Sequence, residues 1–587
     1  MIFIKKFLFL LSPNERKKIS LLIFMLLIMA LLDVIGVASI LPFIAILTNP
    51  SIIETNLIVK FIYQSSFMIG VENEQQFLFV LGIIVFLLLL FSLSFKSLTI
   101  YFQERFVQNR EYSIGKRLLE RYFNQPYSWF LNRNSSDLSK TILSEIGNLI
   151  GSGFRPLMDL IAKGIVAISL IILLIVVDIK LAFIIGFLLG SAYGLIFFFL
   201  RKILNQIGLG RFNSNQKRFN SVNEAFGAVK ELKLGGLEKI YINRFSESSQ
   251  NYAKSIASSQ VISQLPRFLL EAIAFGGILL ILLYIISQTG SFQKALPIIS
   301  LYVFAGYRLM PALQQIYASA TQLSFVAPAL NGIYEELKNL DNYDLDKRKD
   351  KLSFNKSISL KNISYSYPNS FKLTLNDINL DIPYKSKIGL VGPTGSGKTT
   401  LVDIILGLLE PQNGSLEIDN QNIINKNERI WQNSLGYVPQ HIFLSDDTIA
   451  ANIAFGEESD KIIQKDVETA AKIANLHDFV LKDLPNKYET LVGERGIRLS
   501  GGQRQRIGIA RALYHKPEVL ILDEATSALD NQTEKAVMDA VNNLSKDLTI
   551  ILIAHRLNIL KNCDIIFKLD KGRLIKQGTF NELIISN

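Results

Sequence analysis

The residues best suited to chemistry form a glycine-rich segment in the last third of the chain. Residues 392–400 fit the pattern G-x-x-x-x-G-K-[ST], between the apolar run Ile388–Val391 and the helix-forming run Leu401–Leu409. Between a strand and a helix, such glycines let successive backbone N–H groups point at phosphate oxygens, and the helix start adds its positive end. The residues expected to bind a nucleoside triphosphate are Gly392, Pro393, Thr394, Gly395, Ser396, Gly397, Lys398, Thr399 and Thr400. Lys398 would neutralise the β- and γ-phosphates, and the Thr399 hydroxyl would hold Mg²⁺.

Two adjacent carboxylates follow a second apolar run. Residues 519–522 are Val-Leu-Ile-Leu, and Asp523 and Glu524 come next. Asp523 suits a place beside the magnesium ion, and Glu524, one position further on, suits the general base that polarises the attacking water. A surface or helix-capping pair would not explain why four aliphatic residues precede both acids. The two motifs together predict nucleotide hydrolysis.

A third motif carries the family resemblance. Leu499–Gln503 reads Leu-Ser-Gly-Gly-Gln before the basic helix Arg504–Leu513. Alone, this could be any anion-binding helix start. With the two motifs above it resembles the signature of an ABC transporter nucleotide-binding domain, so the chain is identified as a member of that family.

The resemblance implies roles for further residues of this sequence. Tyr367 matches the aromatic residue that stacks on adenine, and Gln440 matches the one that senses Mg²⁺ and the γ-phosphate. His555 matches the histidine that orients the γ-phosphate and the water, whereas a lone histidine would more often be structural. Asp530 ends the segment Ser-Ala-Leu-Asp that crosses between two such domains. The signature residues expected to touch ATP are Ser500, Gly501, Gly502 and Gln503.

The family arrangement also implies a second copy. There, two nucleotide-binding domains face head to tail, so that each ATP lies between Lys398 of one chain and Ser500 of the other. This chain has one such domain with every catalytic motif intact, so we expect a homodimer rather than a heterodimer. ATP binding would close the pair and hydrolysis would reset it.

The first part of the chain must then supply the membrane helices. Each apolar stretch there is near or above the roughly 20 residues that a membrane-crossing helix needs. The six predicted spans are Leu21–Leu47, Phe77–Thr99, Leu157–Val177, Leu181–Leu200, Pro266–Ile286 and Ile298–Ala320. A large soluble protein with buried helices is the weaker interpretation, because several stretches are apolar on all sides. The fold class is therefore an all-α six-helix transmembrane domain followed by an α/β P-loop NTPase domain.

Domain boundaries and orientation follow from composition. We expect an interfacial N-terminal helix over 1–18, a transmembrane domain over 19–330, a linker over 331–355 and a nucleotide-binding domain over 356–587. Segments 1–18, 101–156 and 201–265 hold 23 Lys and Arg residues, against 3 in the connections on the other side. The positive-inside rule then places both termini and the soluble domain in the cytoplasm, in a bacterial inner membrane.

The same asymmetry accounts for the overall charge. With 62 Lys plus Arg and 51 Asp plus Glu, the net charge is +11, so we expect no nucleic-acid partner. The single cysteine excludes a disulfide framework, an iron–sulfur protein and a thiolate zinc site, and 49% hydrophobic residues exclude a disordered chain.

The long basic connections have a helical pattern. We expect spans two to five to continue as helices well beyond the membrane, with turns near residues 128–136 and 226–236. Contact of these turns with the soluble domain is the favoured interpretation, and isolated helical hairpins are the alternative.

Charges inside spans point to the substrate, because each costs roughly 2.5–3.5 kcal/mol at mid-bilayer on insertion scales. The substrate candidates are Lys96, Arg267 and Arg308. Cations facing an internal cavity suit an anionic head group such as a pyrophosphate. The alternatives are a local ion pair of Arg267 with Glu271, a Lys96 that extends to the surface, and an Arg308–Asp33 bridge.

Two stretches, 32–43 and 306–311, resemble bacterial lipid-linked-oligosaccharide flippases. That resemblance implies outward movement of a polyprenyl-pyrophosphate glycan, coupled to ATP hydrolysis. Three alternatives stay open: a phospholipid or drug exporter, a peptide exporter, and an ABC regulator or sensor that transports nothing.

Overall fold

The computed structural model describes residues 2–48, 52–55, 57–66, 71, 73–177, 179–289, 292–340, 351–368, 370, 372–423, 427–525, 529–544, 547–554 and 560–585. Two compact units divide the chain. The helical unit comprises residues 1–125 and 133–343, and the mixed unit comprises residues 126–132 and 344–587.

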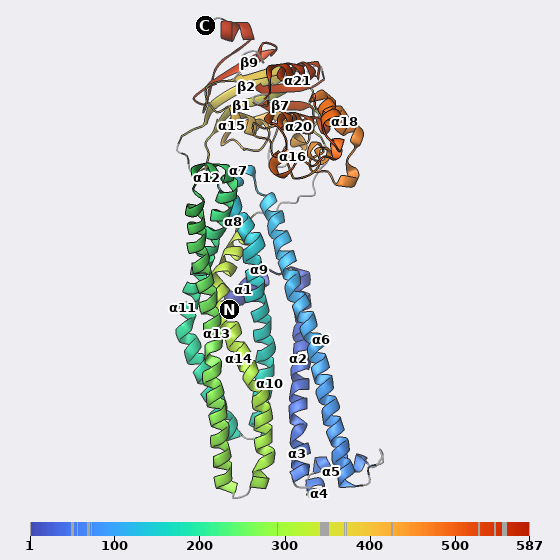
Figure 1. Ribbon diagram of the computed structural model, residues 1–587, viewed down its shortest axis with the longest axis vertical. Helices are drawn as coiled ribbons and strands as arrows, with labels where there is room; N and C mark the ends of the chain where they lie inside the picture. Colours follow the sequence, from blue (N-terminus) through green and yellow to red (C-terminus); the bar gives the residue numbers. More distant parts are fainter. Residues whose placement is uncertain are drawn as a thin grey trace. The chain divides into compact units, whose positions relative to one another are not determined.

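Long helices make up the helical unit (Figure 1). The principal helices are α2 (Pro13–Ala38), α6 (Glu74–Phe123), α10 (Arg155–Val177), α11 (Ile179–Gly227), α13 (Glu238–Thr289) and α14 (Phe292–Asn339). The shorter segments are α1 (Ile2–Phe9), α3 (Ile40–Thr48), α4 (Ile52–Thr55), α5 (Leu57–Ser66), α8 (Ser135–Lys140), η2 (Thr141–Glu145), α9 (Ile146–Leu149), η3 (Ile150–Phe154) and α12 (Val229–Gly235). Helix α11 packs along α13, α10 packs along α14, and α2 packs along α6.

Each predicted span lies on these helices, the first one across α2 and α3, which meet at Ser39. Within the described residues, three helical stretches are long and apolar enough to cross a membrane: Pro13–Leu47, Glu74–Phe123 and Ser135–Val176. Phe79, Phe187 and Phe198 are each more than 70% exposed. Large apolar side chains on the outside fit a lipid environment rather than water.

Two of the helices that carry predicted spans are much longer than a membrane crossing needs. Helix α6 has 50 residues and α13 has 52, so at 1.5 Å per residue each is about 75 Å long, more than twice a hydrocarbon core of about 30 Å. The predicted turns each contain a short helix. Helix α7 (Tyr127–Leu131) precedes α8, and α12 is followed by Gly236, whose φ of +63° suits a left-handed cap.

Helix α1 packs on the helical unit with one apolar face. Phe7 is buried and meets Phe154 edge to face, with ring centroids 4.8 Å apart. The turn into α2 is fixed by a capping box between Ser12 and Glu15. The interfacial position along a membrane stays a prediction.

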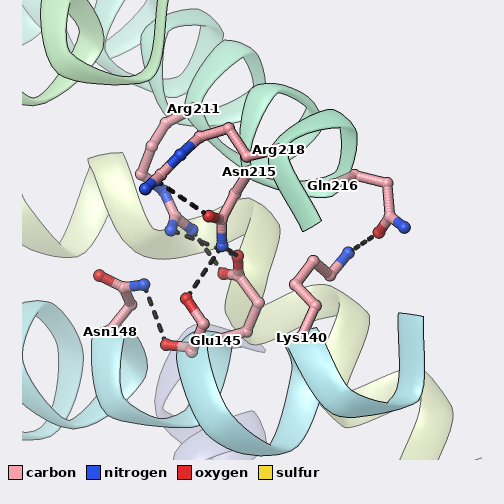
Figure 2. A network of polar contacts seen from close by, with 8 residues as sticks. Lys140, Glu145, Asn148, Arg211, Asn215, Gln216 and Arg218 are labelled. Atoms are coloured by element: carbon pink, nitrogen blue, oxygen red, sulfur yellow. Dashed lines mark hydrogen bonds and ion pairs between the residues drawn. The ribbon is translucent and has the colours of Figure 1, made fainter. Parts of the chain in front are cut away.

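A buried polar cluster joins two of the extensions (Figure 2). Glu145, at the end of η2, accepts hydrogen bonds from Arg211 at 2.6 Å and from Asn215 at 2.7 Å, both on α11. The Glu145 and Arg211 side chains are 0% and 2% exposed. A buried ion pair of this kind needs its full set of hydrogen bonds to offset the cost of removing two charges from water.

The mixed unit contains two sheets among its described residues. An antiparallel sheet has the order β2-β1-β4-β5, and a mostly parallel sheet has the order β10-β9-β3-β8-β7-β6, in which β10 pairs antiparallel with β9. The strands are β1 (Ser357–Tyr365), β2 (Leu375–Pro383), β3 (Lys387–Val391), β4 (Asn413–Ile418), β5 (Gln421–Asn422), β6 (Leu435–Val438), β7 (Val519–Asp523), β8 (Thr549–Ile553), β9 (Ile565–Asp570) and β10 (Arg573–Gly578).

Helices and short turns connect these strands. They are α15 (Lys398–Ile405), α16 (Glu428–Gln432), α17 (Ile449–Ile453), η4 (Ser459–Lys461), α18 (Gln464–Ile473), α19 (His477–Asp483), η5 (Lys487–Glu489), η6 (Glu494–Gly496), α20 (Gly501–Tyr514), α21 (Asn531–Leu544) and η7 (Asn581–Ile585). The parallel sheet is apolar on both faces. Along β7, Leu520 and Leu522 join one core, whereas Val519 and Ile521 join the other. Because apolar cores cover both faces of this sheet, a ligand can reach it only at the ends of its strands.

Candidate nucleotide-binding site

The register of the parallel sheet brings the sequence motifs to one edge. Strands β3, β8, β7 and β6 are neighbours and run parallel, so their carboxyl ends meet at the same edge. The phosphate-binding loop follows β3, Asp523 ends β7, and Gln440 lies two residues beyond β6. Ligands of open α/β sheets bind at this edge.

The loop after β3 has the geometry of an anion cradle. Gly395 and Gly397 have φ values of +78° and +99°, which glycine adopts without strain. A Cβ on Gly392 would lie 2.3 Å from the carbonyl oxygen of Leu569, and one on Gly397 would lie 2.7 Å from Leu375 Cδ2. The backbone therefore has room only for glycine where it turns toward the site.

Lys398 spans this loop. Its Nζ donates to the carbonyl oxygens of Gly392 at 2.9 Å and Pro393 at 3.1 Å. Burial lowers the pKa of Lys398, and the charges of Glu524 and Asp523 act in the opposite direction. The buried hydroxyl of Ser396 has no hydrogen-bond partner within the described residues. A cation and an unused hydroxyl in one loop fit a phosphate chain.

Asp523 is the last residue of β7, and Glu524, which follows it, has an unusual backbone conformation. Asp523 is 5% exposed, and Glu524 has a φ of +49°, which is uncommon for a residue with a side chain. The Glu524 backbone N–H donates to the carbonyl oxygen of Ile553 on β8 at 3.1 Å. Gln440 Nε2 donates to Glu524 Oε2 at 2.7 Å. Strain of this kind concentrates at functional sites.

Aromatic residues line the base of helix α15. The Tyr367 hydroxyl lies 3.0 Å from the Thr400 hydroxyl, and its ring packs edge to face on Tyr365. Thr399, one position earlier, is exposed. Asp403 is buried on the same helix, and burial, with a contribution from Asp523, raises its pKa to about 6.

The start of α20 presents the signature residues. Ser500 is an exposed N-cap: its Oγ accepts from the Gln503 N–H at 3.2 Å, and Gln503 Oε1 accepts from the Ser500 N–H at 2.8 Å. Gly501 and Gly502 form the first turn. Backbone N–H groups at an exposed helix start suit an anion. Asp530 is also exposed, and hydrogen bonds from Thr533 lower its pKa.

The structure brings together Lys398, Asp523, Glu524 and Gln440, as the sequence predicted. His555 and residues 526–528 lie outside the described residues, so their predicted roles stay predictions. Asp403 was missed, because a single acid inside an apolar helical run gives no motif.

The three substrate candidates in the helical unit differ. Arg267 is 59% exposed and its Nε donates to Glu271 at 2.7 Å, so the local ion pair is confirmed. Lys96 lines a cavity. The side chain of Arg308 is not among those described, and Asp33, buried at 2% exposure, accepts a 3.2 Å hydrogen bond from Ser92.

Family comparisons agree with this geometry. The model for "ABC transporter" matches residues 375–527, and the model for "ABC transporter transmembrane region" matches residues 20–307. The matched regions include the phosphate-binding loop, the signature and the first five predicted spans.

Similar proteins share both units. An "ATP-dependent lipid A-core flippase" of Saccharophagus degradans is 31% identical over 483 residues, which are 80% of this chain and 79% of that protein. The "Heterocyst differentiation ATP-binding protein HepA" of Nostoc sp. is 30% identical over 85% of this chain and 81% of its own length. A bacterial Atm1-family ABC exporter solved with ATP bound has a TM-score of 0.79 at 22% identity, covering 97% of this chain and 96% of that one, so the folds are alike.

Proposed function

Because the chain belongs to the ABC transporter family, with membrane helices and an ATP-hydrolysing domain, we propose that two copies form a flippase for a phosphorylated glycolipid. The preferred substrate is a polyprenyl-pyrophosphate-linked oligosaccharide, moved from the cytoplasmic to the outer leaflet of a bacterial inner membrane. The termini and the nucleotide-binding unit would face the cytoplasm.

The proposed ATP site rests on one observation. Four side chains lie together at the carboxyl edge of the parallel sheet: Lys398, Asp523, Glu524 and Gln440. Lys398 would leave its carbonyl partners for the β- and γ-phosphates. Mg²⁺, when bound, neutralises charge on those oxygens, and Thr399, Asp523 and Gln440 are the residues that would hold it. Glu524 would take a proton from the attacking water.

The second copy would complete each site. The Ser500 N-cap is exposed at a helix start, and the two glycines after it are half-buried in the single chain. In the proposed dimer they bind the γ-phosphate held by the partner's loop. Closure around ATP would reach the membrane helices through the turns that the sequence predicts near residues 128–136 and 226–236.

The substrate rests on two observations. Relatives that resemble this chain are named as flippases of lipid A-core, so a lipid substrate is the first class to consider. Lys96 lies in an apolar helix and lines a cavity, where a cation suits an anionic head group. A phospholipid exporter is the second candidate, because the same relatives are lipid transporters.

Transport in sealed vesicles tests the proposal. The full chain is reconstituted, and ATP-dependent movement of a polyprenyl-pyrophosphate glycan, of phosphatidylglycerol and of a cationic dye is measured in parallel. Movement of the glycan alone is expected. Movement of phospholipid or dye instead supports the exporter alternatives, and ATPase stimulation without movement of any probe supports a regulator.

A further inference from the structure

A polar cavity of about 460 Å³ lies inside the helical unit. Helices α2, α6, α10 and α14 contribute its lining, together with Gly151 of η3. Its volume is within the range of small-molecule sites. The lining is unusual for apolar helices, because most of it is charged or carries a side-chain amide.

One face of α10 supplies a row of charges. Arg155, Asp159 and Lys163 are four residues apart, so they share a face of the helix. Arg155 is paired with Glu104 of α6 at 2.7 Å. Lys96, also on α6, adds a further cation to the lining. Since Lys96, Asp159 and Lys163 lie within apolar stretches that could cross a membrane, each charge there is costly and marks a functional site by default.

Asp159 connects three helices at this cavity. It accepts hydrogen bonds from Gln103 of α6 at 2.7 Å and from Gln315 of α14 at 3.2 Å. Gln322, two turns along α14, also lines the cavity. Carboxylates and amides in this arrangement can both accept and donate, which is what sugar hydroxyls require.

We propose that this cavity binds the phosphorylated sugar head group of the transported lipid. Lys96 and Lys163 bind the phosphate, while Asp159, Gln315 and Gln322 bind the sugar hydroxyls. A lipid with a positively charged head group fits this cavity poorly. Arg155 already neutralises Glu104, so the remaining charged residues of the lining are two lysines and one carboxylate, and their net charge is positive. The inference rests on the proposed function and names the residues that select its substrate class.

The test uses the full chain in phosphatidylcholine nanodiscs with three probes: undecaprenyl pyrophosphate carrying one sugar, undecaprenyl pyrophosphate alone, and phosphatidylglycerol. The readout is the mole fraction of probe that half-maximally stimulates ATP hydrolysis. In the double variant Lys96→Ala/Lys163→Ala this fraction is expected to rise at least tenfold for both pyrophosphates. Lys116→Ala, on the exposed surface of α6, is the matched control and should leave it unchanged.

The sugar contacts are tested separately. Gln315→Met is expected to raise the half-saturating fraction for the sugar-bearing probe about tenfold, while the response to undecaprenyl pyrophosphate alone stays as in the wild type. Gln322→Met serves where Gln315→Met lowers the thermal stability. If both methionine variants respond to the sugar-bearing probe as the wild type does, the sugar contacts are wrong.

Two failures remain distinguishable. If the wild type is stimulated by the pyrophosphate probes and moves them, but the double lysine variant responds at the same mole fraction, the cavity assignment is wrong and the proposed function stands. If the wild type responds to phosphatidylglycerol and to neither pyrophosphate, the proposed substrate is wrong, and the head-group assignment with it.

Discussion

The side-chain amide of Gln440 donates a 2.7 Å hydrogen bond to the carboxylate of Glu524. Gln440 follows β6 and Glu524 follows β7, and these strands are parallel neighbours with Val438 opposite Leu522. The pairing register therefore sets the separation of the two side chains, and the positive φ of Glu524 turns its carboxylate out of the line of the strand. The contact fixes the carboxylate at the edge of the site where Lys398 lies.

Replacing Glu524 by Gln should separate nucleotide binding from hydrolysis. The amide of glutamine keeps an oxygen that can accept from Gln440, but it cannot take a proton from water. Turnover should fall about 10²–10⁴-fold while ATP affinity is kept. Phosphate release and bound-nucleotide assays on the purified full chain measure the two effects.

Glu457→Gln is the control for that experiment, because Glu457 is an exposed carboxylate outside the site. In the proposed mechanism the Glu524→Gln protein also accumulates as an ATP-closed dimer. Hydrolysis at a substantial fraction of the wild-type rate would remove Glu524 from the role of base.

Asp403 should make stability depend on pH. Burial, with Asp523 nearby, raises its pKa to about 6 from an ordinary value of 3.8. Between those values the folded state holds a proton that the unfolded chain has lost, so stability falls as pH rises through about 4 to 6 and the cost persists above it. Asp403→Asn should therefore stabilise the nucleotide-binding unit by about 1–3 kcal/mol at pH 7.5, and less at pH 5.

Thermal unfolding of the full chain at pH 5, 6 and 7.5 measures that effect. Asp446→Asn, at an exposed carboxylate, is the control and should shift the midpoint equally at each pH. A gain in the Asp403→Asn protein that does not grow between pH 5 and pH 7.5 would show that the pKa of Asp403 in the folded state is not raised to about 6.

The Glu145–Arg211 pair should show strong non-additivity. Each single change, Glu145→Leu or Arg211→Met, leaves the other charge buried without its counter-charge, which typically costs about 3–5 kcal/mol. The double variant Glu145→Leu/Arg211→Met removes both charges and should cost much less than the sum of the two single changes. Thermal midpoints in detergent for the two single variants and the double variant close the cycle. Additive losses would mean that the pair is not a single buried unit.

The sequence predicted the nucleotide site better than the cavity, for a physical reason. Loop 392–400 and Asp523 and Glu524 are local motifs whose chemistry requires fixed spacing, and a parallel sheet places strand ends together whatever the rest of the chain does. Their convergence could therefore be predicted without coordinates.

The cavity has no such local pattern. Lys96 and Asp159 come from different helices, and which helix faces pack together is set by side-chain packing along the long helices. The repeat Arg155, Asp159, Lys163 at four-residue spacing was the available signal, at the start of a predicted span. Arg267, one of the three substrate candidates from the sequence, pairs with Glu271 on the same helix, which is the alternative that the sequence also offered.

A shared ATP site predicts an asymmetric complementation pattern between two inactive chains. Lys398→Met disables the phosphate-binding loop, and Ser500→Arg disables the signature, so either homodimer should be inactive. In a heterodimer that carries one change in each chain, one site contains both defects and the other contains neither. Hydrolysis should then return to well above either homodimer, measured on doubly tagged protein purified through two different tags.

The reciprocal heterodimer makes the test decisive. When both changes are placed in one chain and the partner is wild type, a shared arrangement puts one defect in each site and predicts no activity. If each chain instead used its own Lys398 with its own Ser500, the results would be reversed, because the wild-type chain would keep an intact site. The two heterodimers contain the same substitutions in the same number, so differences in folding or expression cannot produce the pattern, and only a site built from two copies does.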